Sequence, residues 1–225
     1  GLYKRVISHH HQRIPFADRF LKELPTITDL ANAKEDRLMK LWEGLGYYNR
    51  VRNMQKAAIQ MVEQYGGQFP ESYEEIHALK GIGNYTAGAI GSFAFGIPKP
   101  AVDGNVLRVV SRILASREDI MKAKVRTEIE TALEEVIPKD CPGDFNQGLI
   151  ELGAIVCVPN GEPKCEICPA AEICRARKEG IAMELPVKTK AKERKIEKRT
   201  VLVFHDSDTL AIQKRPDKGL LAGLY

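Results

Sequence analysis

The sequence lacks any run of 18 uninterrupted apolar residues, which excludes a helical membrane span. Residues 1–12 (GLYKRVISHHHQ) also lack the apolar stretch and the cleavage site of a secretory signal. We therefore expect a protein of the cytoplasm, or of the nucleus in a eukaryote. The chain has no internal repeat and no low-complexity tract. With 225 residues, 44% of them hydrophobic, it is long enough for one large or two small packed domains. Its net charge of +4 mildly favours a polyanionic partner.

Cysteine is scarce, yet four of the five cysteines fall within 18 residues. The four clustered residues are Cys157, Cys165, Cys168 and Cys174, whereas Cys141 stands apart. In a chain without a secretory signal, such crowding favours metal or iron–sulfur ligation over disulfides or plain thiols. Four thiolates are the ligands of a 4Fe-4S cluster. A tetrahedral zinc ion is the alternative, but it usually takes two close pairs, and only Cys165 and Cys168 form one here.

Helical periodicity dominates residues 14–180, and no β-rich stretch precedes residue 200. The first expected helices are amphipathic and follow a cap at Thr28. Further helices are expected over 57–65, 72–79, 85–95, 105–115, 126–136 and 145–156. Residues 186–199 are a basic linker, either a solvated tether or one that also lies along phosphates. Residues 200–204 and 209–214 alternate around a turn, which predicts a β-hairpin opening a second domain that Tyr225 truncates.

The segment Leu79–Gly88 (LKGIGNYTAG) joins two predicted helices through an apolar-Gly-apolar-Gly turn. Gly81 and Gly83 allow the backbone to turn tightly and to approach a partner closely. The free N–H groups at the start of the following helix, around Thr86, suit a phosphate oxygen. Taken alone, the pattern equally fits an ordinary tight corner between two helices.

Asp103 lies where the helix after the Pro98/Pro100 loop begins. For an isolated aspartate at such a position, an N-cap is the preferred interpretation. The order along the chain changes the interpretation, because a hairpin, a Gly/Pro loop and an aspartate follow one another. This order is the signature of the helix-hairpin-helix DNA glycosylases.

Nearly the whole chain, residues 14–225, resembles the MutY family of adenine DNA glycosylases within that superfamily. The segments that carry the resemblance are LWEGLGYYNRVRN (41–53), LKGIGNYTAGAI (79–90), AVDGNVLRV (101–109), FNQGLIELGAIVC (145–157) and the cysteine cluster. The segment LAIQKRPDKGLLAGLY (210–225) resembles the first strands of the NUDIX-like domain that these enzymes append.

The resemblance implies a mainly α fold, a helix-hairpin-helix glycosylase domain with an iron–sulfur cluster loop. We expect this domain over 1–185, with a hairpin module at about 14–112 and a cluster module at about 113–180. The linker (186–199) and the truncated start of the β-containing NUDIX-like domain (200–225) follow.

The implied function is base excision repair: hydrolysis of the N-glycosidic bond of adenine mispaired with 8-oxoguanine or guanine. The base must be flipped out of the duplex, the leaving adenine protonated, and the oxocarbenium-like sugar stabilised by an anion. By resemblance Asp103 is that anion, with Tyr85 beside it and Asn105 supporting it. Gln147 would face the adenine edge, because an amide pairs with a purine donor and acceptor. Tyr47 would wedge into the base stack, unless it is a core tyrosine.

Tyr85 separates this chain from the similar endonuclease III type, which carries a lysine nucleophile at that position. A phenol cannot form an imine, so we predict a monofunctional glycosylase. Some G:T mismatch thymine glycosylases share the tyrosine and remain an alternative. By resemblance, the four clustered cysteines would hold a structural 4Fe-4S cluster beside the DNA. We expect double-stranded DNA with 8-oxoguanine:adenine or G:A mispairs as partner, no membrane, and a monomer.

Two features depart from the family. Seven residues rather than six separate Cys157 and Cys165, which a loop can absorb. The family's catalytic glutamate, on an N-terminal helix, has no counterpart in this sequence, so we expect an N-terminally incomplete chain. One general acid is typically worth about 10²–10⁴ in rate. We therefore expect little activity, and an inactive DNA-binding fragment is the other alternative. Glu43 is best interpreted as an ordinary surface glutamate.

Overall fold

The computed structural model describes residues 14–189, 196, 198, 200, 202–213, 215, 216, 219 and 223. The chain divides into two compact units, Gly1–Thr189 and Lys190–Tyr225. In the first unit the α-helices are α2 (Ile14–Glu23), α3 (Ile27–Asn32), α4 (Glu35–Leu41), α5 (Asn49–Tyr65), α6 (Tyr73–Ala78), α7 (Asn84–Phe95), α8 (Gly104–Ile113), α9 (Ala123–Val136), α10 (Pro142–Glu151) and α11 (Arg175–Lys178). Shorter turns are η2 (Leu152–Val156), η3 (Cys165–Ile167) and η4 (Ala182–Glu184). The expected mainly α fold is confirmed.

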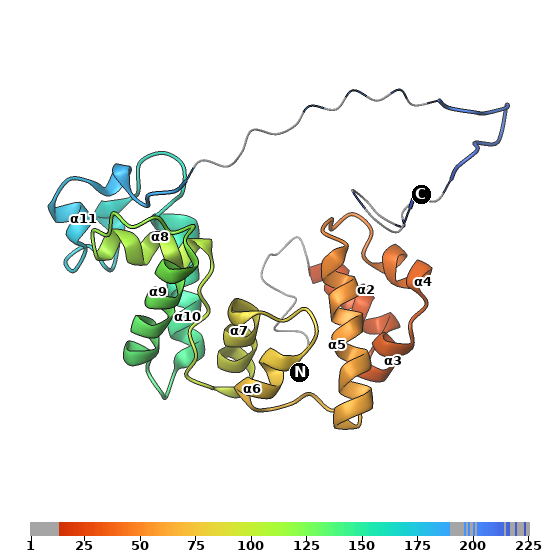
Figure 1. The fold of residues 1–225 in the computed structure, drawn as a ribbon, viewed down its shortest axis with the longest axis horizontal. Helices are drawn as coiled ribbons and strands as arrows, with labels where there is room; N and C mark the ends of the chain where they lie inside the picture. Colours follow the sequence, from red (N-terminus) through yellow and green to blue (C-terminus); the bar gives the residue numbers. More distant parts are fainter. Residues whose placement is uncertain are drawn as a thin grey trace. The chain divides into compact units, whose positions relative to one another are not determined.

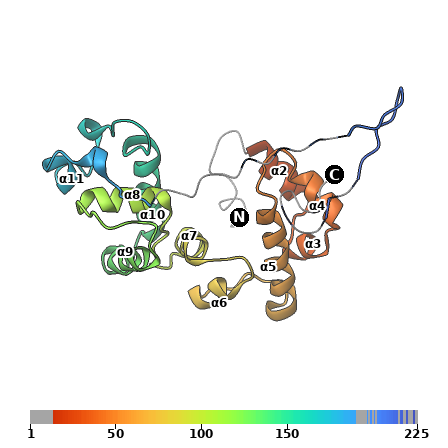
Figure 2. The same cartoon turned by 45° about the horizontal axis from the view of Figure 1, so that its top comes forward.

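Two groups of helices make up the first unit. Figures 1 and 2 both show α2 to α5 on one side, α8 to α11 on the other, and the short helices α6 and α7 between them. Phe20, Leu38 and Trp42 form the centre of the first core, with Phe20 and Trp42 meeting edge to face. In the second core, Leu107 of α8 and Ile129 of α9 belong to one buried apolar cluster. Each group of helices therefore has a core of its own.

Helix starts follow from side-chain caps. Thr26 caps α3 in a reciprocal capping box with Asp29, so the expected cap at Thr28 is wrong by two residues. Ser72 caps α6 by accepting from the N–H of Glu75. No helix in the described part of the chain has both the length and the apolar character that a membrane crossing needs.

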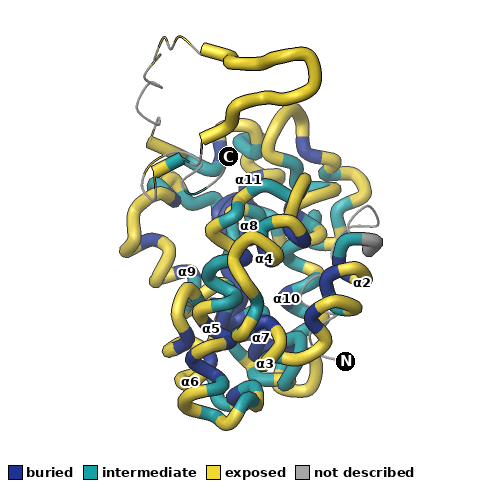
Figure 3. Tube along the Cα trace, turned by 90° about the vertical axis from the view of Figure 1, so that its right-hand side faces the viewer, coloured by how far each residue is buried: buried dark blue, intermediate teal, exposed yellow. Residues whose placement is uncertain are grey.

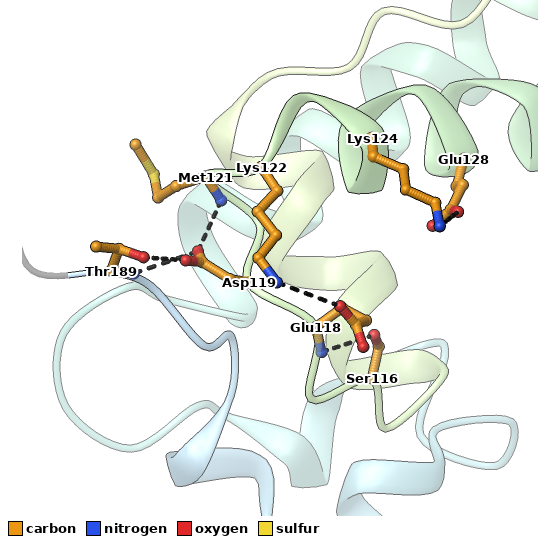
Figure 4. Close-up of polar contacts among 8 residues, drawn as sticks. All are labelled: Ser116, Glu118, Asp119, Met121, Lys122, Lys124, Glu128 and Thr189. Carbon is orange, nitrogen blue, oxygen red and sulfur yellow. Dashed lines mark hydrogen bonds and ion pairs between the residues drawn. The ribbon is translucent and has the colours of Figure 1, made fainter.

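The last residues of the first unit are held against the loop between α8 and α9. The Asp119 carboxylate accepts from the Met121 N–H at 2.9 Å and from the Thr189 N–H at 3.2 Å, and the Thr189 hydroxyl also bonds to it (Figure 4). The Ile120 N–H donates to the Val187 carbonyl at 3.1 Å. The chain therefore leaves the first unit at Thr189, with residues 186–189 packed on it.

The described residues of the second unit are nearly all exposed, in contrast to the buried positions along the helices of the first (Figure 3). His205 and Leu210 form an isolated antiparallel bridge around a turn capped by Asp206. The turn lies where the sequence predicts a hairpin, but within the described residues this one bridge stands in place of extended strands. The NUDIX-like domain stays a prediction.

Candidate active site

The hairpin between α6 and α7 needs one of its two glycines for its own geometry. Gly81 has a φ of +81°, and a Cβ there would lie 2.6 Å from the Cβ of Asn53 on α5. Gly83 has an ordinary φ of −105°, and a Cβ on it would meet no atom within 4 Å. The backbone around Gly83 therefore faces open space, at the uncapped start of α7. Thr86, in the first turn of α7, is partly buried.

Asp103 is the N-cap of α8, and both of its carboxylate oxygens are held. The Oδ1 atom accepts from the backbone N–H of Asn105 at 2.8 Å and of Val106 at 2.9 Å. The Oδ2 atom accepts from the Asn105 side-chain amide at 2.8 Å. The structure thus contains the cap and, in addition, an orienting bond from Asn105. These bonds fix the orientation of the carboxylate at the positive end of a helix.

Tyr85, in the first turn of α7, lies beside this carboxylate. Partial burial raises the pKa of the Tyr85 phenol above its ordinary value, the negative charge of Asp103 raises it further, and Arg50 on α5 opposes the shift. Tyr85 is still 41% exposed, so a ligand can reach it. The phenol therefore lies within electrostatic reach of both Asp103 and Arg50, and stays protonated at neutral pH.

Tyr47 precedes α5 and is 83% exposed, which rules out the core-tyrosine interpretation. Its φ of +48° is left-handed, a conformation that bulky residues seldom adopt. Its carbonyl accepts from the N–H of Arg50 at 2.8 Å.

Glu43 does not have the properties of a general acid. Its carboxylate is exposed and pairs with Lys40 at 2.7 Å. The hydrogen bond and the charge of Lys40 lower the pKa of Glu43 below its ordinary value. The group is therefore ionised at neutral pH and has no proton to donate, as expected of a surface glutamate.

Two buried arginines on α8 connect Asn105 to the cysteine region, and the sequence motifs did not single them out. Arg108 donates to Asn105 Oδ1 at 2.9 Å, to the Gly153 carbonyl at 2.6 Å and to the Cys157 carbonyl at 2.7 Å. Arg112 donates to the Cys157 sulfur at 3.2 Å and to the Leu185 carbonyl at 2.9 Å. Each is only 4% exposed. Arginines four apart in a helix with few other polar residues were the available signal.

All four clustered cysteines line one cavity, together with Arg112 and Arg177. The space among these residues is about 300 Å³, part of which is open solvent. Burial raises the pKa of the Cys165 thiol, the other three clustered cysteines raise it further, and Arg112 lowers it. Cys141 is exposed and is not among the lining residues.

The donor set around this cavity consists of four thiols, the ligand type that a 4Fe-4S cluster takes. Within the described ranges, no three His, Cys, Asp or Glu side chains converge on a point that could hold one metal ion. In a four-iron cluster each thiolate binds a different iron, so four sulfurs around one cavity suffice.

Helix α10 presents two neighbouring amides. Gln147 is partly buried and donates to Glu151 on the same helix. Asn146 is 1% exposed, and the sequence motifs did not single it out. The signal was its position: Asn146 shares the apolar helix face of Leu149, Ile150 and Gly153, at i, i+3, i+4 and i+7. A polar residue on such a face must satisfy its hydrogen bonds inside the protein.

Comparison with known proteins agrees with this geometry. The family model of the HhH-GPD superfamily base excision DNA repair proteins matches residues 11–139. The adenine DNA glycosylase of Homo sapiens is 43% identical over 159 residues, which cover 70% of this chain and 29% of that protein. The chain thus spans less than a third of this relative's length.

Two solved structures share the fold. A thermostable thymine-DNA glycosylase superposes with a TM-score of 0.67 at 25% identity, covering 79% of this chain and 83% of that one. A trapped endonuclease III–DNA covalent intermediate superposes with a TM-score of 0.66 at 29% identity, covering 80% and 84%. The chain belongs to the HhH-GPD superfamily of base excision DNA repair proteins and is of the MutY type within it.

Proposed function

We propose that the protein is a monofunctional DNA glycosylase that hydrolyses the N-glycosidic bond of adenine opposite 8-oxoguanine or guanine. The observation that carries the proposal is the Asp103 carboxylate, held by three hydrogen bonds beside the partly exposed Tyr85. A fixed carboxylate with an open approach is what an oxocarbenium-like sugar requires, because preorganised charge needs no rearrangement during the reaction.

The reaction breaks the bond between the sugar C1′ and the adenine nitrogen, and the electron pair leaves with the base. Asp103 stabilises the positive charge that develops on the sugar, and water then adds to C1′ and loses a proton. Tyr85 lines the site without supplying an amine nucleophile, so no imine forms and the strand is not cut. The leaving base needs a proton, and because Glu43 is exposed and ionised, the acid stays unassigned among the described residues.

The same proposal assigns the DNA contacts. The open backbone at Gly83, in the turn that the left-handed Gly81 makes possible, takes a phosphate together with the first turn of α7 at Thr86. Tyr47 enters the base stack, and its exposure and left-handed backbone support this role. Gln147 reads the edge of the flipped adenine. A DNA substrate places the protein in the bacterial cytoplasm or the eukaryotic nucleus, where we expect it to act as a monomer.

We further propose that Cys157, Cys165, Cys168 and Cys174 hold a 4Fe-4S cluster. Bound there, the cluster would tie together the loop that follows η2 and position it for DNA. Arg112, which donates to the Cys157 sulfur, would offset the negative charge of the thiolates. Residues 186–199 would form the linker, of which 186–189 pack on the first unit, and residues 200–225 the start of a NUDIX-like domain that reads the 8-oxoguanine.

The test is a single-turnover assay with the protein in excess over duplexes that carry one 8-oxoguanine:adenine, G:A or G:T pair. Alkali then reveals abasic sites. We expect slow release of adenine, because no acid is assigned, and no release of thymine, because the human adenine glycosylase is 43% identical and the thymine glycosylase 25%. Release of thymine alone would establish the alternative specificity. Retention of the duplex on a gel without release would identify a DNA-binding chain that lacks its acid.

A further inference from the structure

The buried amide of Asn146 connects three segments of the first unit. Its Oδ1 atom accepts from the Ala101 N–H at 2.9 Å. Its Nδ2 atom donates to the Lys99 carbonyl at 2.9 Å and to the Ser92 hydroxyl at 2.8 Å. One side chain of α10 therefore holds the loop between α7 and α8 at two points and holds α7 at a third.

The backbones around this amide are in close contact. A Cβ on Gly88 of α7 would lie 2.1 Å from the Pro100 carbonyl oxygen of the loop. A Cβ on Gly143 of α10 would lie 3.0 Å from the Ser92 carbonyl oxygen. Because backbone rather than side chains meets here, van der Waals packing sets how close the segments are. The Asn146 hydrogen bonds, which are directional, set how they are aligned.

Asp103 is two residues beyond Ala101, and Val102 between them is fully buried. Gln147 is the next residue after Asn146 on α10. The loop leads from the point that Asn146 holds to the Asp103 carboxylate. From the same point, α10 leads to the base-reading amide of Gln147. We propose that Asn146 is a positioning residue that aligns the Asp103 carboxylate with the site where Gln147 holds the flipped base. This inference rests on the proposed function.

The experiment measures where the Asp103 charge lies without requiring turnover. Two duplexes carry, opposite 8-oxoguanine, either a neutral tetrahydrofuran abasic analogue or a pyrrolidine analogue whose protonated nitrogen places a positive charge in the sugar ring. The ratio of their dissociation constants, called here the charge ratio, reports how well a carboxylate faces the sugar. A variant that is merely less stable does not change this ratio, because both duplexes need the same folded protein.

Asp103→Asn is the reference variant, and we expect it to lower the charge ratio by about 10- to 100-fold, the worth of one charged hydrogen bond. Asn146→Ala should lower the ratio in the same direction while leaving affinity for the neutral duplex near the wild-type value. Asn146→Ser, which leaves a hydroxyl and room for a water, is the milder variant should Asn146→Ala fail to fold. It should show a smaller loss.

Two controls separate an effect on the alignment of the Asp103 carboxylate from an effect on protein stability. Ser92→Ala removes the bond from Asn146 to α7 and a 3.4 Å bond from the same hydroxyl to the Ala89 carbonyl within α7. It keeps both bonds from Asn146 to the loop, so the charge ratio should stay close to the wild-type value. Leu38→Ala, in the separate core around α4, should lower the melting temperature without changing the ratio. Folded Asn146 variants with the wild-type ratio, alongside a collapsed ratio in Asp103→Asn, would overturn the inference alone. An unchanged ratio in Asp103→Asn, or a wild-type chain that does not bind the neutral duplex, would instead refute the proposed function.

Discussion

Substitution of Asp103 separates its observed role as a helix cap from its proposed role as the catalytic anion. Asparagine caps helices as well as aspartate does, so Asp103→Asn keeps the Oδ1 bonds to the N–H groups of Asn105 and Val106. It replaces Oδ2, however, with an NH₂ group that faces the donor amide of Asn105. The loss should be that of one hydrogen bond, about 1 kcal/mol. Asp103→Ala removes the cap as well and should cost about 2–3 kcal/mol in total.

A double variant, Asp103→Asn with Asn105→Asp, is the matched control. The new carboxylate at position 105 accepts from the new amide at position 103 and also from Arg108, which donates to position 105 in the present structure. The hydrogen-bond pattern is restored, but the charge moves away from the sugar. We therefore expect a melting temperature close to that of the wild type. For a domain of this size, each kcal/mol corresponds to roughly 2–4 °C.

Single-turnover adenine release measures the second role. Loss of a preorganised electrostatic group typically costs about 10²–10³ in rate, and we expect a decrease of this size in Asp103→Asn and in the double variant alike. Binding of the pyrrolidine duplex, measured in parallel, reports the same charge without a turnover. A folded Asp103→Asn protein that retains its rate and its preference for the cationic analogue would show that Asp103 is only a helix cap.

Three further predictions concern the hairpin, the phenol and the cysteines. Gly81→Ala should lower the free energy of unfolding by about 1–3 kcal/mol, because position 81 has a left-handed φ and a Cβ there would clash with Asn53. Gly83→Ala should leave thermal stability unchanged but lower DNA affinity in an anisotropy titration. Burial raises the pKa of Tyr85, so the folded state holds its proton more tightly than the unfolded state, and the resulting stability is present below about pH 10 and lost above it. Tyr85→Phe should flatten the decline of the melting temperature across that range, and an equally steep decline would contradict the assigned shift. Cys165→Ser should lower iron and sulfide content and visible absorption, while Cys141→Ser should leave them unchanged, and zinc without sulfide would instead identify a zinc site.

Local signals predicted most of the helical elements. The expected helices 72–79, 85–95, 105–115 and 126–136 correspond to α6, α7, α8 and α9 with ends displaced by a few residues. The expected helix 145–156 differs more, because it divides into α10 and the wider π-helical turn η2. Within η2, Arg108 takes the Gly153 carbonyl, and a Cβ on Gly153 would lie 2.5 Å from that of Asn105. Helical periodicity does not reveal a contact between residues this far apart in sequence.

The difference between local signals and long-range contacts also explains which site residues could be predicted from the sequence. Asp103, Asn105 and Tyr85 belong to compact motifs, and the structure brings them together. Asn146, Arg108 and Arg112 act across 45 to 73 residues, on Ala101, Gly153 and Leu185. In the sequence they are marked only as polar residues at helix positions that are expected to be buried. Since burial of an unsatisfied polar group is costly, such positions predict a partner but not its identity.

The cap and the anion at Asp103 depend on each other. A helix N-terminus favours a carboxylate there, and the cap bonds orient it. In the proposed reaction, the feature that stabilises α8 would therefore also hold the charge ready for the sugar. The opposing demand is that the carboxylate must stay open to a ligand, which a full set of protein bonds would prevent. Asp103 meets both demands because its Oδ1 atom takes the two backbone donors while Oδ2 takes only one. A carboxylate oxygen has two lone pairs, so Oδ2 keeps one that, in the proposed reaction, would face the positive charge on the sugar.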